Sequence, residues 1–231
     1  MTIPLAGASA GRVAIVTGGS RGVGRATIVR LAARGYAVVV NYLHDQDGAE
    51  STVETVLAAR GAAVAVRADV ADDLDVQRLF TETIVAFGRV DAVVHTVEGR
   101  IIPAPVVDVD LEEFDALCRI NTRATLIVNR EAARRVRNGG AIVNLASSAV
   151  GSASLRNGPY AVSKAAADVL TRVLAIELRE RDITVNAVSL DVGEPCAPSR
   201  IADIVVHLLS ARGHGLTGQM IRLDANLPRG R

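Results

Sequence analysis

Lysine is almost missing from this sequence. Of the 26 basic side chains, only Lys164 is a lysine, and all the others are arginines. Lysine carries a compact ammonium whose pKa can shift, so a site that needs this chemistry cannot accept arginine in its place. Lys164 also follows Tyr160 by four residues, although the chain has only three tyrosines. The two residues are therefore the first candidates for a functional site.

Aromatic residues are scarce too, and basic residues are not in excess over acidic ones. Aromatic residues make up 3% of the 231 residues and tryptophan is absent, so the core must consist of Ala, Val, Leu and Ile. The net charge of +1 gives no sign of a nucleic-acid or membrane surface. The composition is that of a folded protein, and the length suits a single domain over residues 1–231.

Sulfur ligands and long apolar runs are scarce as well. Cys118 and Cys196 fit no metal or disulfide spacing, so we expect no metal site and a reducing, cytoplasmic setting. The opening residues lack a basic segment followed by an apolar one, and we expect no signal peptide. No apolar run is long enough for a membrane span.

Short β-branched runs alternate with longer helical patterns along the whole chain. Most of the runs are continuously apolar, as in strands that are buried on both faces. The alternation predicts an α/β fold, a single doubly wound domain with helices on both faces of a parallel sheet. We expect strands at 13–17, 37–42, 63–67, 92–96, 141–145, 184–189 and 219–224, and helices near 23–34, 47–60, 72–87, 111–137, 159–181 and 199–211.

A glycine-rich turn connects the first strand to the first helix. Glycines at this point allow a tight turn and a close approach of the backbone to a phosphate, and the helix N-terminus attracts a pyrophosphate. The bland alternative is an ordinary strand-helix turn, but the position after the first strand favours a dinucleotide site. We expect the cofactor to contact Gly18, Ser20, Arg21, Gly22, Val23 and Gly24.

Residues after the second and third strands indicate which dinucleotide binds. An NAD site usually has an acidic residue after the second strand, whereas Asn41 and Tyr42 stand here and no acid occurs before Asp45. With Arg21 nearby, unless it is only a solvated turn residue, the pattern favours NADP(H). After the third strand come Asp69 and Val70, where the carboxylate either meets the adenine or caps the next helix.

The fifth strand and the following helix hold a second group of polar residues. Ser147 and Ser148 follow the strand, while Tyr160 and Lys164 lie one turn apart on one helix face. A tyrosine beside an ammonium could protonate a carbonyl oxygen that a serine hydroxyl holds. The alternative without a function is that Tyr160 and Lys164 are merely an exposed amphipathic pair. It is disfavoured because Lys164 is the sole lysine.

These motifs together resemble the short-chain dehydrogenases/reductases, in particular the ketoacyl-reductase type, over nearly the whole chain. Thr17-Gly18-x-x-x-Gly22-x-Gly24 matches the cofactor turn of that family, and Tyr160-x-x-x-Lys164 matches its catalytic pair. Ser148 resembles the catalytic serine and Asn121 the active-site asparagine.

The resemblance implies a seven-stranded Rossmann-type sheet in the order 3-2-1-4-5-6-7 and a homodimer or homotetramer. It makes Tyr160 the general acid/base and gives Lys164 two roles, binding the nicotinamide ribose and lowering the pKa of Tyr160. Ser148 would orient the substrate carbonyl, and Asn121 would hold a proton-relay water. A loop one residue short leaves Ser147 open as the alternative to Ser148.

Three departures from the family pattern stand out. The usual Asn-Asn-Ala-Gly after the fourth strand reads His95-Thr96-Val97-Glu98. Glu98 is either an extra acid or substrate anchor within the site, or a loop side chain that points away, and we favour the loop interpretation. The Pro-Gly after the sixth strand is also replaced, and only residues 193–198 stand where the family has a lid.

The leading hypothesis is an NADPH-dependent oxidoreductase that reduces a ketone or aldehyde, with a small-molecule carbonyl substrate. The short lid predicts an open site and a bulky substrate, such as an intermediate of secondary metabolism. One alternative is a catalytically degenerate NADP-binding protein, acting as a sensor or assembly partner. Another is a dehydratase or epimerase on the same scaffold.

Overall fold

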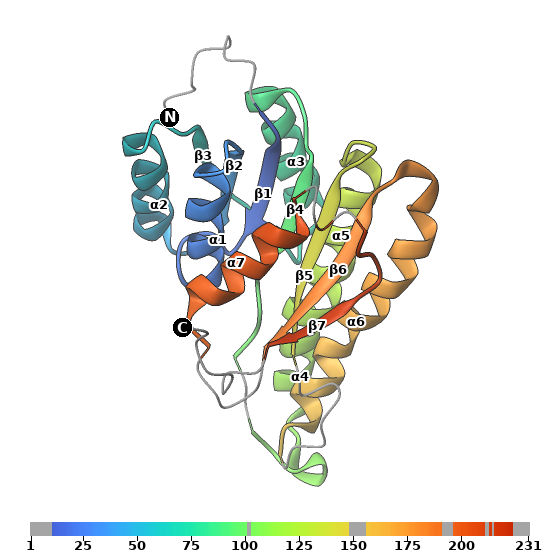
Figure 1. Cartoon of the computed structure of the whole chain (residues 1–231). Coiled ribbons are helices and arrows are strands. Elements are labelled where there is room, and N and C mark those ends of the chain that lie inside the picture. The colour runs from blue at the N-terminus through green and yellow to red at the C-terminus, as the bar shows by residue number, and fades with distance from the viewer. Residues whose placement is uncertain are drawn as a thin grey trace, which may run out of the picture.

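A computed structural model describes residues 11–100, 103–147, 156–190, 196–210, 213 and 215–223 of this chain. Seven parallel strands form one sheet in the order β3-β2-β1-β4-β5-β6-β7, which confirms the predicted fold and strand order. Figure 1 shows the strands running from the end near the N-terminus towards the end where α4 lies. The strands are β1 Val13–Thr17, β2 Ala37–Tyr42, β3 Ala63–Arg67, β4 Ala92–His95, β5 Ala141–Ser147, β6 Thr184–Leu190 and β7 Met220–Leu223.

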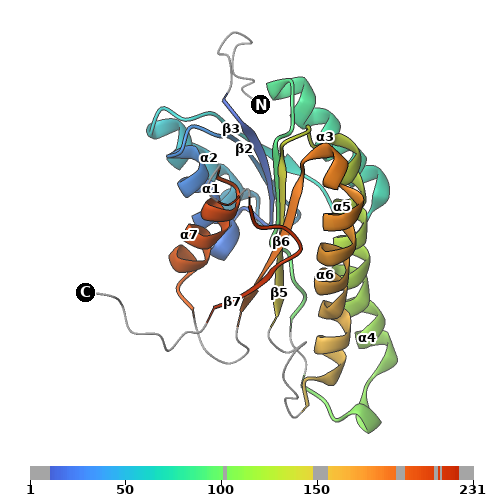
Figure 2. The ribbon, with the colours of Figure 1, turned by 45° about the vertical axis from the view of Figure 1, so that its right-hand side comes forward.

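Helices cover both faces of the sheet, as the edge-on view in Figure 2 shows. One layer contains α1, α2 and α7, and the other contains α3, α5 and α6. The helices are α1 Gly22–Ala32, α2 Gln46–Ala58, α3 Asp73–Phe87, α4 Leu111–Cys118, α5 Ala124–Arg135, α6 Gly158–Glu177 and α7 Pro198–Leu208. No helix in these described ranges has the length and apolar content that crossing a membrane requires.

Alternating side chains of the central strands build two separate cores. In β1, Ile15 packs with the α3, α5 and α6 layer, whereas Val16 packs with the α1, α2 and α7 layer. Both side chains are fully buried, and burial of such a side chain stabilises the fold by about 1.5–3 kcal/mol. Burial on both sides explains why the strands read as continuous apolar runs rather than as alternating ones.

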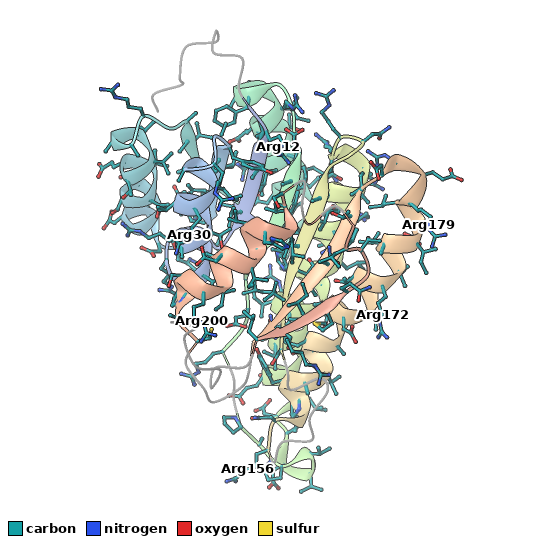
Figure 3. All side chains as sticks on the ribbon, viewed as in Figure 1. Arg12, Arg30, Arg156, Arg172, Arg179 and Arg200 are labelled. Atoms are coloured by element: carbon teal, nitrogen blue, oxygen red, sulfur yellow. The ribbon has the colours of Figure 1, made fainter. Side chains whose placement is uncertain are left out.

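The arginines lie on the outside of these helical layers. Figure 3 shows Arg30 on α1, Arg200 at the start of α7, and Arg172 and Arg179 along the α6 side. Arg172 pairs with Asp168 at 2.9 Å on the exposed face of α6. Lys164, on the same helix, is buried, so the sole lysine occupies an environment unlike that of these arginines.

The predicted helix at 111–137 is interrupted in the structure. A π-helical turn at Arg119–Arg123, η2, separates α4 from α5, because Asn121 and its neighbours bond to groups on other segments. A π-turn adds one residue to the helix and is frequent at functional sites. Asp110 caps α4, since its carboxylate accepts hydrogen bonds from the N–H groups of Glu112 and Glu113.

The connection after β6 is short, as the sequence predicts. β6 ends at Leu190 and α7 begins at Pro198, and residues 191–195 of this connection lie outside the described part of the chain. The parallel register brings the carboxyl ends of β1, β4 and β5 together, with Thr17 opposite His95 and His95 opposite Asn144. Functional side chains that follow these strands therefore lie at one edge of the sheet.

Candidate active site

A cleft of about 530 Å³ lies at this edge, between the glycine-rich turn and the ends of β2, β3 and β4. It brings together ten of the residues expected at the cofactor. They are Gly18, Ser20, Arg21, Gly22, Val23, Gly24, Asn41, Tyr42, Asp69 and Val70. Thr96, Val97 and Glu98 continue the lining towards the catalytic helix α6.

The glycine-rich turn is shaped for a phosphate group. Gly18 has a φ of +64°, which side chains other than glycine rarely adopt. A Cβ at Gly24 would lie 2.2 Å from the carbonyl oxygen of Gly18, so only glycine permits α1 to start this close to the strand. Arg21 precedes α1 without capping it by its side chain, and the first turn of the helix faces the cleft with free N–H groups.

The end of β2 offers no carboxylate to a ribose. Asn41 is buried, and its amide nitrogen donates to the carbonyl oxygen of Ala68 at 3.0 Å. Asp45, the first acidic residue after the strand, caps α2 by accepting the N–H of Gly48 at 3.1 Å. The exposed Arg21 has no side-chain partner within the described residues. At this end of the cleft, the Arg21 guanidinium has no partner among the described side chains, whereas the Asp45 carboxylate is occupied in capping α2.

Asp69 does not cap the helix that follows it. The capping residue of α3 is Asp72, which accepts the N–H of Asp75 at 3.0 Å, so that alternative is wrong. Asp69 accepts the N–H of Ala71 at 2.9 Å and forms an ion pair with Arg119 at 2.6 Å. The pair joins the cleft to the π-turn and holds the carboxylate at the cleft wall.

Tyr160 and Lys164 lie together on α6, and each side chain is only 3% exposed. The Lys164 Nζ lies 3.4 Å from the carbonyl oxygen of Leu145. The Tyr160 hydroxyl donates to a carboxylate oxygen of Glu98 at 3.2 Å, and the same oxygen lies 3.5 Å from Nζ of Lys164. The interpretation of Glu98 as a loop side chain that points away is therefore wrong, because its carboxylate contacts both members of the pair.

The environment raises the pKa of Tyr160 instead of lowering it. Burial is the largest cause, the charge of Glu98 adds to it, and a hydrogen bond with Ser147 opposes both. Burial lowers the pKa of Lys164, while Glu98 acts in the opposite direction. The resemblance implied that Lys164 lowers the pKa of Tyr160. In this structure the pKa of Tyr160 is raised instead, because the hydroxyl is buried and lies beside the Glu98 carboxylate.

His95 lies beneath the pair at the end of β4. Its Nδ1 lies 2.9 Å from the Thr17 hydroxyl, whereas Nε2 is buried without a hydrogen-bond partner in the described part of the chain. Burial and the charge of Lys164 lower the pKa of His95 to about 3. The imidazole is therefore neutral at physiological pH and is not a proton donor there.

Asn121 connects the π-turn to both the loop and the catalytic helix. Its side-chain oxygen accepts the N–H of Gly99 at 2.8 Å, and its amide nitrogen donates to the Ser163 hydroxyl at 2.9 Å. The main-chain carbonyl of Asn121 accepts the Thr125 hydroxyl. Asn121 thus holds the segment beside Glu98 against α6.

The serine of the site is only partly described. Ser148 lies outside the described residues. Ser147 ends β5, is 4% exposed, and forms a hydrogen bond with Tyr160. Ser147 thus lies beside the Tyr160 hydroxyl, where the sequence predicts a serine. The choice between Ser147 and Ser148 as the functional serine stays open.

Sequence reasoning missed two contributors to this site. Ser163 donates to the carbonyl oxygen of Tyr160 at 2.8 Å, and nothing in its sequence context distinguishes it from other helical serines. Arg119 is the second: it pairs with Asp69, which lies 50 residues away in sequence. Such long-range pairs have no local signal.

Comparison with known proteins identifies the family pattern. A family model described as enoyl-(acyl carrier protein) reductase matches residues 18–194. Versicolorin reductase 1 of Aspergillus parasiticus is 41% identical over 183 residues, which cover 78% of this chain and 68% of that protein. A hydroxynaphthalene reductase-like protein of Metarhizium majus is 39% identical over 181 residues, covering 78% of this chain and 67% of that protein.

Solved structures agree with this assignment. A dehydrogenase/reductase from Sinorhizobium meliloti superposes with a TM-score of 0.89 at 32% identity, covering 94% of this chain and 96% of the other. A short-chain dehydrogenase from Burkholderia cenocepacia, solved in complex with NADP, has a TM-score of 0.87 at 29% identity and covers 94% of this chain and 98% of its own.

Proposed function

Because this chain belongs to the short-chain dehydrogenase/reductase family, we propose that it is an NADPH-dependent reductase of a ketone or aldehyde. The observation that carries the proposal is the buried Tyr160–Lys164 pair beside a cleft that begins at the glycine-rich turn before α1. The cofactor supplies a hydride to the carbonyl carbon. Tyr160, whose phenol is protonated at neutral pH, gives its proton to the carbonyl oxygen.

The preference for NADPH rests on the adenosine end of the cleft. Arg21 has no partner among the described side chains, and Asp45 is committed to α2. A 2′-phosphate would meet a guanidinium there and no opposing carboxylate. Related structures from Burkholderia cenocepacia contain NADP, which agrees with this choice.

For the substrate we propose a bulky, planar carbonyl compound of secondary metabolism. The relatives are named for the reduction of versicolorin and of hydroxynaphthalene, and a naphthalene is a planar, fused aromatic system. Only a short connection separates Leu190 from Pro198, so little chain is available to cover a substrate on that side.

We also propose that the enzyme is a homodimer or homotetramer built on the α5 and α6 layer. Four apolar side chains of α6 are 42–66% exposed, namely Val162, Val169, Val173 and Ile176. Their spacing places them along one side of the helix. Ala167 of the same helix is instead buried against Ala146 and Ala187 of the sheet, so it does not belong to this row.

A second candidate function is that of an NADP-binding protein without turnover. The observation that favours it is Glu98, whose carboxylate contacts both Tyr160 and Lys164 where a substrate oxygen would bind. This function predicts tight cofactor binding without reduction of any carbonyl.

NADPH consumption separates the two. We expect oxidation of NADPH with fused-ring ketones and quinones, and a fall of about 10²–10⁴-fold in the Tyr160→Phe variant with cofactor affinity nearly unchanged. Tyr36→Phe is the matched control, because Tyr36 lies at the opposite edge of the sheet and donates to Leu209. Full turnover in Tyr160→Phe would contradict the proposal.

A further inference from the structure

Tyr160 loses a proton in every reductive turnover and must regain it from water. Tyr160 is 3% exposed, and its neighbours Lys164, Ser147, His95 and Asn121 are each at most 4% exposed. In contrast, the Glu98 side chain is 48% exposed and accepts the Tyr160 hydroxyl at 3.2 Å. Among the described groups around the tyrosine, Glu98 is the one that reaches both the phenol and solvent.

We propose that Glu98 is a proton-transfer residue that returns a proton from solvent to Tyr160. The inference rests on the proposed reductase function and extends it to a residue where the family pattern has glycine. After the phenol O–H bond breaks and the alcohol O–H bond forms, an acid of the solvent (hydronium or protonated buffer) gives a proton to the exposed Glu98 carboxylate, which passes it to the phenolate. The phenol O–H bond and the Glu98 carboxylate are thereby restored, the conjugate base of the acid stays in solvent, and no electrons are exchanged.

The backbone at Glu98 is held in place through the next residue, Gly99. The N–H of Gly99 donates to Asn121, and Asn121 in turn bonds Ser163 on the catalytic helix. A Cβ at Gly99 would lie 2.5 Å from a methyl group of Ile120, so the segment packs directly against the π-turn. These contacts hold the backbone of the loop at a constant distance from α6.

Asn121 is less suited than Glu98 to pass a proton from solvent to Tyr160. The resemblance assigns Asn121 a relay water, and in this structure its carbonyl oxygen accepts the Thr125 hydroxyl while its side chain bonds Gly99 and Ser163. Asn121 is also only 1% exposed.

The charges around Glu98 favour exchange with the phenol. Lys164 and Tyr160 face the carboxylate from α6, while the neutral His95 lies below them on β4 and Ser147 contacts the phenol from β5. A phenolate next to the Glu98 carboxylate is an unfavourable pair of like charges, which favours return of a proton to the phenolate. Burial is the largest cause of the raised pKa of Tyr160, and the charge of Glu98 adds to it.

Chemical rescue tests this proposal. We expect Glu98→Gln and Glu98→Gly to lower kcat by about 10²-fold or more with little change in KM for the carbonyl. Acetate should restore the rate of Glu98→Gly in proportion to its concentration, and should leave the wild type and Glu98→Gln unchanged. Glu54→Gln, an exposed glutamate of α2, is the control. Wild-type kcat in Glu98→Gln, or a Glu98→Gly variant faster than wild type without acetate, would overturn the proposal.

A titration without substrate separates this inference from the proposed function. The ultraviolet absorbance of tyrosinate, measured against a Tyr160→Phe background, reports the pKa of Tyr160 in the cofactor-free protein. We expect Glu98→Gln to lower that pKa, because the opposing charge is gone and the Lys164 ammonium remains. An unchanged pKa would contradict the proposal even if the enzyme is active. A wild type that reduces no carbonyl would overturn the proposed function, while the lowered pKa would still support the link between Glu98 and Tyr160.

Discussion

The Nζ of Lys164 lies 3.4 Å from the carbonyl oxygen of Leu145, so the sole lysine of the chain ends against the backbone of β5. The side chain is 3% exposed, and a longer, planar guanidinium could not keep the same position between Leu145 and Glu98. This contact explains why the position differs from the exposed arginine sites.

We therefore expect Lys164→Arg to lose both NADPH affinity and turnover. The larger guanidinium must displace its neighbours, which costs about 1–3 kcal/mol of folding stability. Thermal denaturation, NADPH titration and turnover measure the three effects. Arg172→Lys, the reverse exchange at an exposed pair with Asp168, should leave all of them unchanged. A Lys164→Arg variant with wild-type affinity and rate would remove the argument from the sole lysine.

Arg21→Ala should weaken NADPH binding and leave NADH binding nearly unchanged. Loss of hydrogen bonds to a charged phosphate costs about 1.5–3 kcal/mol, or about ten- to one-hundred-fold in Kd. Nicotinamide fluorescence measures both affinities. Arg34→Ala, just beyond the far end of α1, should change neither of them. Equal affinities of the wild type for the two cofactors would contradict the predicted preference.

Val169→Asp should dissociate the oligomer. Val169 is 51% exposed in the apolar row of α6, and a charge buried against a partner helix is unfavourable. Light scattering at micromolar concentration should give a dimer or tetramer for the wild type and a monomer for the variant. Val85→Asp, at an 80% exposed valine of α3, should keep the wild-type mass. A monomeric wild type would show that this face has no partner copy.

His95 should make the fold sensitive to acid. Its folded pKa, about 3, lies below the ordinary value of 6.5, so below pH 6.5 the unfolded chain binds a proton that the folded chain does not. Stability is thus unaffected above pH 6.5 and decreases as the pH falls, by about 2 kcal/mol at pH 5. We expect His95→Asn, which cannot titrate, to lose less stability than the wild type between pH 7 and pH 5 in urea denaturation. Parallel curves for the two proteins would contradict this.

The sequence predicts most of the fold because the signals are local. Continuous apolar runs mark strands buried on both faces, and three of them, at 13–17, 37–42 and 63–67, match β1, β2 and β3 to the residue. The π-turn at Arg119–Arg123 was missed, since its cause lies in bonds from Asn121 to Gly99 and Ser163. Periodicity within one helix carries no information about such partners.

The sequence motifs predict which residues form the candidate site, but they do not predict the direction of the Glu98 side chain or the pKa of Tyr160. The glycine-rich turn and the Tyr160–Lys164 spacing are motifs, and the structure places their residues at one sheet edge. The direction in which Glu98 points depends on the path of the loop after β4, which Asn121 fixes from 22 residues away. The pKa of Tyr160 depends first on the burial of its hydroxyl and then on the charge of Glu98, and the Tyr160–Lys164 spacing carries no information about either.

The π-turn also restricts how the length of this chain can vary. Each residue rotates a helix by about 100°, so the additional residue in η2 sets which side of α5 faces the sheet. Deletion of one residue there would restore a regular helix and turn either Asn121 away from Gly99 or the buried Val128 away from the core. A single-residue insertion or deletion within η2 is thus expected to misplace either the site residue Asn121 or the buried face of α5.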